Sequence, residues 1–172
     1  MSEQGLQVLG TLRAEDGVGV VRIELLTASP VDDVWRAVTD PTRLAMWLGE
    51  IEGDLRVGGA FRGRWFPSGW DGSGRVLECE PGTRFLVESA EEGNPLTTDE
   101  LVLTPEGSGA TRVVLTKRGA PLAWIAAFGV GLQIHLENLD ASLAGGGPVD
   151  PDPFWAELLP QYEQLADGIG RA

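Results

Sequence analysis

Two helix-start signals lie inside an otherwise strand-rich chain, and they restrict the folds that the chain can adopt. Ser29 is suited to cap a helix whose first residue is Pro30, and Asp32 is placed to bond back to the Ser29 N–H as in a capping box. Asp40 followed by Pro41 repeats the signal. The sequence therefore predicts two short helices between the second and third of its expected strands.

The first of these helices is expected to be amphipathic. Its apolar residues recur at positions i, i+3, i+4 and i+7, which lie on one face of a helix: Val31, Val34, Trp35 and Val38. Such a stripe needs a sheet to cover it. The pattern therefore predicts that this helix packs onto a sheet.

Seven segments have the composition of strands, because they are alternating or apolar-rich and are bounded by Gly, Pro and Asp. They lie near residues 6–13, 18–26, 60–66, 74–80, 85–89, 101–104 and 112–118. Most of the connections between them are short, whereas parallel strands need crossovers of a dozen or more residues. The spacing therefore predicts an antiparallel meander.

The most apolar part of the chain is predicted to form one long helix. Gly129 and Gly131 each cost about 1 kcal/mol relative to Ala in a helix interior, so we expect its secure part over residues 131–144. The glycines at 145–147 then end it. Apolar residues recur at spacings of three or four and form a buried stripe: Ile125, Phe128, Leu132, Leu136, Leu139 and Leu143.

The residues after 147 are predicted to form a further helix that begins at Asp152-Pro153 and is kinked or split by Pro160. We expect residues 1–147 to form one domain and residues 148–172 a helical extension packed on it. In the alternative interpretations Phe154 and Trp155 fill a pocket from within, or the tail seals a homodimer. The apolar side chains available for docking are Phe154, Trp155, Leu158, Leu159, Tyr162 and Leu165.

The chain is acidic, with 13 Lys and Arg residues against 26 Asp and Glu residues and a formal net charge of −13. This charge repels phosphate backbones and anionic lipid headgroups, so we do not expect a nucleic-acid partner. The first residues lack the basic and apolar regions of a secretory signal, and the apolar stretch at 120–134 is shorter than the roughly 20 residues that span a bilayer. We therefore expect a cytoplasmic protein without a membrane span.

Cys79 is the only cysteine and His135 the only histidine in the sequence. A single cysteine excludes an internal disulfide, a Cys-x-x-Cys redox pair and a zinc site built from several cysteines. The glycine clusters at 107–109 and 145–147 lack the Lys-Ser/Thr of a phosphate-binding loop. We therefore expect neither a metal nor a cofactor.

A set of short motifs follows a fixed order along the chain: Val34-Trp35, Thr39-Asp40-Pro41, Leu44, Trp47, residues 58–61, 74–78 and 111–116, Gly119 and residues 135–139. Their order and spacing resemble the helix-grip superfamily, also called START-like or SRPBCC, and in particular the branch similar to the C-terminal domain of the activator of Hsp90 ATPase. The resemblance covers roughly residues 18–145. Two features depart from it, because the family usually opens its last helix with Gly-Trp where this chain has Gly131-Leu132, and the tail from Pro148 exceeds the usual length.

The resemblance implies an α+β helix-grip fold, in which a curved antiparallel sheet of six to seven strands wraps around the long C-terminal helix and leaves a hydrophobic cavity. The alternation of Phe61, Gly63 and Trp65 agrees, because it places two aromatic side chains on one face of the sheet. His135 is expected to be the polar contact of a ligand. The alternative is that these residues fill a solid core. The expected ligand-binding residues are Trp47, Phe61, Trp65, Phe85, Val87, Val113, Leu115, Phe128, Leu132, His135 and Leu139.

Three classes of function follow from this pattern. The first is a non-enzymatic protein that binds a small hydrophobic molecule. The aromatic segment 65–70 would then gate the cavity; the alternatives are that it contacts a partner or is an ordinary hairpin connection. The second is a protein-interaction module similar to the co-chaperone domain. The third is an enzyme resembling polyketide cyclases or hydrolases, for which His135 and scattered carboxylates are the available groups. We favour the first class and assign no catalytic residue.

Overall fold

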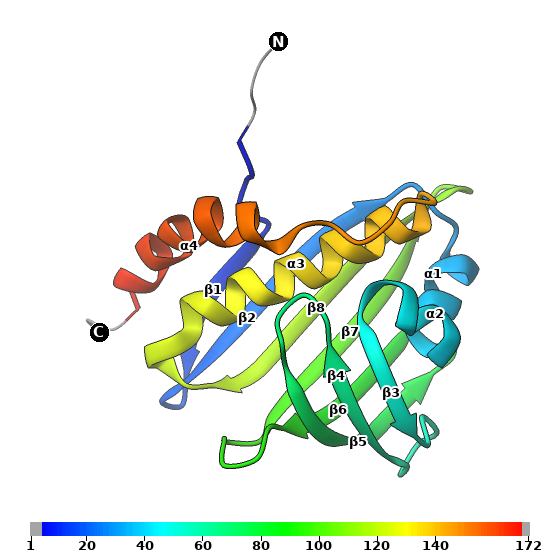
Figure 1. The fold of residues 1–172 in the computed structure, drawn as a ribbon, viewed down its shortest axis with the longest axis horizontal. Helices are drawn as coiled ribbons and strands as arrows, with labels where there is room; N and C mark the ends of the chain where they lie inside the picture. The colour runs from blue at the N-terminus through cyan, green and yellow to red at the C-terminus, as the bar shows by residue number, and fades with distance from the viewer. Residues whose placement is uncertain (1–4, 170–172) are drawn as a thin grey trace.

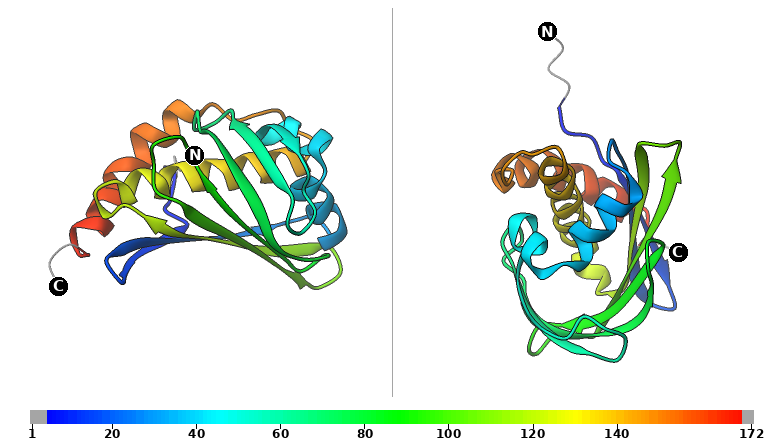
Figure 2. Two further views of the ribbon diagram at one scale, coloured as in Figure 1. Left: turned by 90° about the horizontal axis from the view of Figure 1, so that it is seen from below. Right: turned by 90° about the vertical axis from the view of Figure 1, so that its right-hand side faces the viewer.

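The structure, a computed structural model that describes residues 5–169, is an antiparallel sheet with one long helix along its concave face (Figures 1 and 2). The described chain contains the strands β1 (Gly10–Glu15), β2 (Val18–Thr27), β3 (Gly49–Gly53), β4 (Ala60–Trp65), β5 (Asp71–Glu80), β6 (Arg84–Ala90), β7 (Thr97–Glu106) and β8 (Ala110–Ala120). Its helices are α1 (Val31–Thr39), α2 (Pro41–Trp47), α3 (Ile125–Leu143) and α4 (Pro151–Asp167), and a 3₁₀ turn, η1 (Leu122–Trp124), precedes α3.

The strands follow the spatial order β1, β2, β8, β7, β6, β5, β4, β3, and each neighbouring pair is antiparallel. The helix-grip class is therefore confirmed, with eight strands in the described residues instead of the expected six to seven. The additional strand is β3, whose sequence Gly-Glu-Ile-Glu-Gly has little strand propensity. It forms at the sheet edge because β4 pairs with it, with Ile51 opposite Gly63.

The two predicted helix starts have different outcomes. Asp40 caps α2 as expected, because its Oδ1 accepts the Thr42 N–H at 2.9 Å and Pro41 is the first helical residue. The expected capping box at Ser29 is wrong. Pro30 itself is the extended cap residue of α1, and no side chain in residues 5–169 caps the helix start, while the Ser29 carbonyl accepts from the Thr111 hydroxyl at 2.8 Å.

The long helix α3 runs from Ile125 to Leu143 and so begins before the expected secure part at 131. Gly129 is accommodated because the Tyr162 ring of α4 lies against it, so close that a Cβ atom there would be 2.5 Å from Tyr162 Cδ1. The local cost of the glycine is therefore offset by the packing of α4 across this point. The packing of Tyr162 therefore outweighs the low helix propensity of Gly129, which had suggested that the helix starts later.

The helix α4 starts at Pro151 with Asp150 as its cap, two residues before the expected start, and continues through Pro160 without being split. It packs against α3 and β1. The fully buried Tyr162 hydroxyl donates to Gln133 Oε1 of α3 at 2.6 Å. Gln133 also accepts the Leu9 N–H at 3.0 Å, so one buried amide joins α3, α4 and the segment before β1.

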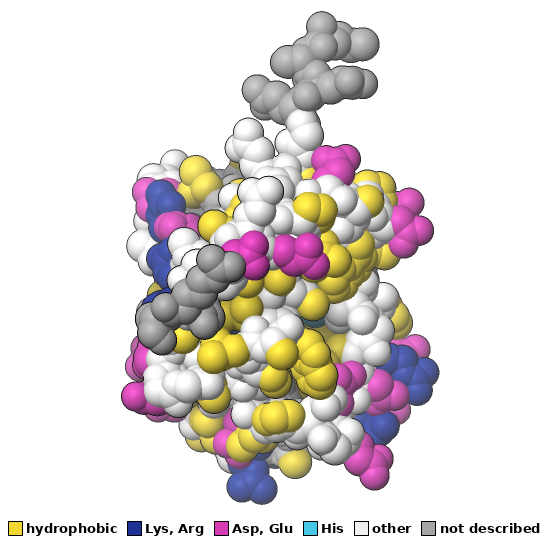
Figure 3. Space-filling view, turned by 90° about the vertical axis from the view of Figure 1, so that its left-hand side faces the viewer, with side chains coloured by type: hydrophobic (Ala, Val, Ile, Leu, Met, Phe, Trp, Pro, Cys, Tyr) yellow, Lys and Arg dark blue, Asp and Glu magenta, His cyan; other side chains and the backbone are white. Residues whose placement is uncertain are grey.

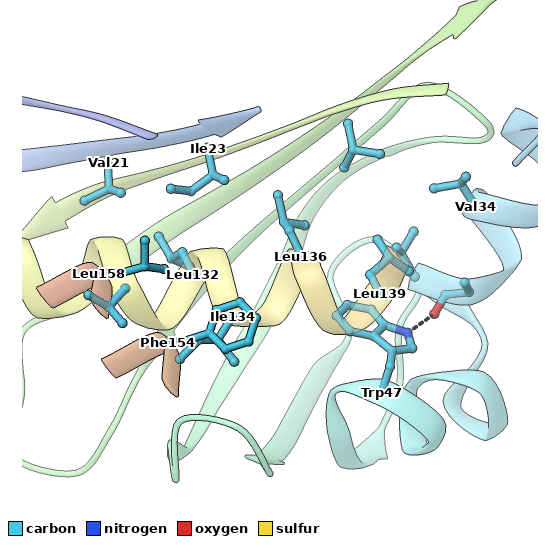
Figure 4. Packing of buried hydrophobic residues seen from close by; sticks show 14 of the residues in the cluster. Val21, Ile23, Val34, Trp47, Leu132, Ile134, Leu136, Leu139, Phe154 and Leu158 are labelled. Atoms are coloured by element: carbon cyan, nitrogen blue, oxygen red, sulfur yellow. Dashed lines mark hydrogen bonds between the residues drawn. The ribbon is translucent and has the colours of Figure 1, made fainter. Parts of the chain in front are cut away.

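The core lies between the sheet and α3, and α1 and α2 close one end of it (Figure 4). Trp47 and Leu139 lie at that end, whereas Leu132 lies nearer to Phe154 and Leu158 of α4. The Trp47 indole donates to the Ala37 carbonyl at 2.9 Å, which joins α2 to α1. No helix in residues 5–169 is long and apolar enough to cross a membrane.

Candidate functional site

A cavity of about 410 Å³ lies between the concave face of the sheet and α3. Most of its lining is aromatic or aliphatic. Ser68 and Trp124 are the exposed members of the lining, so the cavity opens between the β4–β5 connection and the start of α3. Figure 3 shows one side of the molecule, on which hydrophobic side chains gather near the centre with acidic and basic side chains around them.

The structure brings together nearly all of the residues that the sequence analysis assigned to a ligand-binding wall. Val113 is the exception, because it is fully buried in the core near the end of the sheet onto which α1 packs. Phe154 of α4 also lies in the core, while its neighbour Trp155 lines the cavity. The expected residues found in the lining are Trp47, Phe61, Trp65, Phe85, Val87, Leu115, Phe128, Leu132, His135 and Leu139.

The mouth of the cavity is rich in tryptophan. Trp65 and Trp70 flank the β4–β5 connection and stack with ring centroids 5.1 Å apart and an interplanar angle of 17°. Trp124 of η1 is 55% exposed, and Trp155 comes from α4. The aromatic segment 65–70 therefore contains the β4–β5 hairpin connection, and three of its residues, Trp65, Ser68 and Trp70, line the cavity.

His135 lies on the helix side of the cavity and contacts the β4–β5 connection. Its Nε2 is 2.9 Å from the Ser68 hydroxyl oxygen, a hydrogen bond that joins α3 to the opposite rim. Burial, and secondarily the positive charge of Lys117, lower the pKa of His135 to about 3. The imidazole is therefore neutral at physiological pH, where one ring nitrogen can donate and the other can accept.

An ion pair on the sheet side of the cavity was missed by the sequence analysis. Lys117 of β8 lies opposite Asp99 of β7, and its Nζ donates to Asp99 Oδ2 at 2.9 Å and to the Thr97 hydroxyl at 3.1 Å. The ammonium also lies 5.6 Å from the Phe128 ring centroid. Both charged residues line the cavity, and the Lys117 side chain is only 9% exposed.

The alternation of side chains along the last predicted strand could have indicated one member of this pair. Lys117 follows Leu115 by two residues on the same face of the predicted last strand. Asp99 was not predicted to lie on a strand, because the strand before the last one was expected only over residues 101–104. In the structure this strand, β7, begins at Thr97. Asp99 Oδ1 is buried and has no hydrogen-bond partner among the described residues.

These groups give the site two kinds of wall. Aromatic and aliphatic side chains offer non-directional burial, whereas the Lys117–Asp99 pair and the His135–Ser68 pair offer directional hydrogen bonds. Within residues 5–169, no group of three or more His, Cys, Asp and Glu side chains is placed to hold a metal ion. The arrangement is suited to holding an organic molecule that is mainly apolar.

The family model described as "Activator of Hsp90 ATPase homolog 1-like protein" matches residues 28–144, which is more than half of the chain. The chain belongs to this family. The match ends before α4, so the helical extension lies outside the part shared with the activator-like family. No curated protein sequence matches the chain significantly.

Solved structures of similar proteins agree with this assignment. CalU16 from Micromonospora echinospora is 29% identical, with a TM-score of 0.77, and the match covers 91% of this chain and 95% of CalU16. DynU16, from the dynemicin biosynthetic locus, is 28% identical with a TM-score of 0.68, and the match covers 78% of this chain and 49% of DynU16. A protein from Chromobacterium violaceum is 29% identical with a TM-score of 0.61, covering 72% of this chain and 96% of that protein.

Proposed function

We propose that this protein binds a small, mainly apolar molecule in the cavity between the sheet and α3, without transforming it. The observation that carries the proposal is the cavity of about 410 Å³ with its aromatic and aliphatic lining. Protein interiors are packed closely and rarely leave voids larger than a water molecule, so a space of this size needs an explanation. Its volume lies within the range of small-molecule sites.

Two further observations support this function. The similar protein DynU16 comes from a biosynthetic locus, that of dynemicin. Gly131 faces the cavity from α3, and an added Cβ atom there would be 3.9 Å from Ser68 Cβ, an ordinary contact distance. The chain thus keeps a glycine inside a helix at a place where a larger side chain would occupy the cavity.

The polar groups favour binding over catalysis. A general base works best when its pKa lies near the operating pH, and the lowered pKa of His135 makes the imidazole a weak base. A catalytic Ser–His pair also needs a carboxylate that orients the imidazole, and no such contact to His135 occurs among the described hydrogen bonds. Ser68 and His135 therefore fit a role as hydrogen-bonding wall residues.

The proposal is tested with N-phenyl-1-naphthylamine, an uncharged fluorescent molecule, and with the variants Gly131→Leu and Gly131→Ala. Leucine fills part of the cavity, so we expect it to weaken binding of this molecule by at least tenfold, while alanine changes binding little. Circular dichroism shows whether both variants keep the fold. Equal affinity in the wild type and the leucine variant would place the bound molecule outside the cavity.

Native mass spectrometry supplies an independent test with the natural ligand. Protein purified from cells that naturally produce it is compared before and after denaturation. Extra mass that is lost on denaturation identifies a retained ligand. A protein that carries no extra mass and shows no thermal shift with lipids or aromatic polyketides would contradict the proposal and favour a protein partner.

A further inference from the structure

We infer that the natural ligand carries an uncharged hydroxyl group that binds the Lys117–Asp99 pair, donating its hydrogen to the Asp99 carboxylate. This inference rests on the proposed function, because it specifies the chemistry of the molecule in the cavity. It assigns a specificity role to two residues on the sheet, on the opposite wall from His135.

The Asp99 carboxylate has unused hydrogen-bonding capacity. Its Oδ2 accepts from Lys117 Nζ, while its Oδ1 is buried without a partner. An ionised carboxylate has about four acceptor positions, and a buried acceptor without a partner costs roughly 1–3 kcal/mol. Asp99 lines the cavity, and the torsion about its Cβ–Cγ bond is soft, so we expect a ligand donor to turn the carboxylate toward the cavity. A ligand donor would satisfy the carboxylate that the protein leaves incomplete.

Lys117 complements this acceptor with a donor. Two of its three N–H groups are engaged by Asp99 and Thr97. The third leaves the ammonium able to donate to an oxygen beside the Phe128 ring, which lies on the cavity side of α3. A hydroxyl group both donates and accepts, so one such group can bind the carboxylate and the ammonium together.

The charges around the ion pair favour a neutral ligand group at this position. Lys117 and Asp99 compensate each other, and His135 is neutral. Glu91, the other acidic residue of the lining, already accepts a hydrogen bond through each of its carboxylate oxygens. A ligand carboxylate or ammonium beside the Lys117–Asp99 pair would therefore bring an unpaired charge into an apolar space, which is costly because the lost hydration is not replaced. A hydroxyl group satisfies the free hydrogen-bonding positions without changing the net charge of the cavity.

The cavity also has a direction. One end of it is apolar and lies at Trp47 and Leu139, beside α1 and α2 (Figure 4). The ion pair lies beside Phe128, near the start of α3 and the mouth. We therefore expect the apolar body of the ligand to point toward α2 and its hydroxyl group to lie nearer the mouth.

The test compares 2-naphthol with 2-methoxynaphthalene, which keeps the oxygen acceptor and loses the O–H donor. Their dissociation constants are measured by fluorescence at pH 7 in the wild type and in the double variant Asp99→Leu, Lys117→Met. The matched control is Glu100→Leu, Arg84→Met. Glu100 follows Asp99 on β7 but pairs with Arg84 at 2.7 Å on the other face of the sheet.

We expect the wild type and the control to prefer 2-naphthol over the methyl ether by about tenfold more than the double variant does. The two molecules differ in their hydration free energy, but this difference is the same for every protein. It therefore cancels when the ratio of the two dissociation constants is compared between proteins. Unchanged ratios in a double variant that still binds both molecules would overturn the hydroxyl assignment and leave the proposed function intact. Failure of the wild type to bind either molecule would overturn the proposed function, and with it this inference.

A crystal structure of the wild type with 2-naphthol tests the contact even if the double variant does not fold. We expect the naphthol oxygen within about 3 Å of an Asp99 carboxylate oxygen, a normal hydrogen-bond distance. A naphthol that lies in the cavity with its oxygen directed elsewhere would overturn the inference. A naphthol bound outside the cavity would contradict the proposed function as well.

Discussion

Two glycines of α3 have the same local chemistry but different surroundings. Gly129 faces the Tyr162 ring at a distance that leaves no space for a Cβ atom, whereas a Cβ atom at Gly131 would lie 3.9 Å from Ser68 Cβ, an ordinary contact. We predict that Gly131→Ala raises the free energy of unfolding by about 1 kcal/mol through helix propensity, while Gly129→Ala lowers it despite the same propensity gain. Urea denaturation of both variants measures the difference. Stabilisation by both substitutions would show that Tyr162 moves aside freely.

The neutral His135 predicts a pH dependence of stability. The pKa of its side chain is lowered from 6.5 to about 3 in the folded protein, so below pH 6.5 the unfolded chain binds a proton that the folded protein does not. The free energy of unfolding therefore falls as the pH falls below 6.5. Above the pKa of His135 in the unfolded chain, His135 no longer makes the free energy of unfolding depend on pH. Between about pH 6 and pH 5, we expect the wild type to lose about 1 kcal/mol per pH unit more than His135→Gln.

The His135→Gln variant retains an amide that can bond to Ser68 but removes the titration. Urea denaturation at several pH values compares the two proteins, and the carboxylates that titrate in the same range are common to both. Parallel pH profiles would show that the imidazole becomes protonated in the folded state.

Among the helices and strands, the sequence predicted correctly those that are stabilised by residues close together in the chain. Asp40 and Pro41 start α2 with no help from distant residues, so the sequence was sufficient there. β3 depends on pairing with β4, and the full length of α3 depends on packing of α4 against Gly129. Neither contact is visible in a single segment. Alternation predicted most of the apolar lining on the strands and helical spacing that on α3, whereas Asp99 required the correct start of β7.

The two helix starts allow this distinction to be measured. The Asp40 carboxylate accepts the Thr42 N–H, so Asp40→Ala should lower the free energy of unfolding by about 1 kcal/mol. The Ser29 side chain makes no bond to the start of α1, so Ser29→Ala should change it by less than about 0.5 kcal/mol. Chemical denaturation gives both values. A larger loss of unfolding free energy for Ser29→Ala than for Asp40→Ala would instead indicate that Ser29 caps α1.

At the scale of the whole molecule, α4 extends a fold whose family match ends at residue 144. Its contacts go beyond surface docking, because Tyr162 and Leu158 are fully buried and Gln133 of α3 accepts the Tyr162 hydroxyl hydrogen. Trp155 also lines the cavity. We propose that α4 belongs to the same cooperative folding unit as the sheet and α3, and that the extension supports one wall of the site.

Two leucines of α4 test this cooperativity. Leu158 is fully buried and Leu165 is 43% exposed, so Leu158→Ala should lower the free energy of unfolding by about 2–5 kcal/mol and Leu165→Ala by less than about 1 kcal/mol. Because we expect α4 and α3 to unfold together, Leu158→Ala should reduce the hydrogen-exchange protection of amides in both helices by the same free energy. Loss of protection confined to α4 would instead show that the extension unfolds independently while α3 stays packed on the sheet.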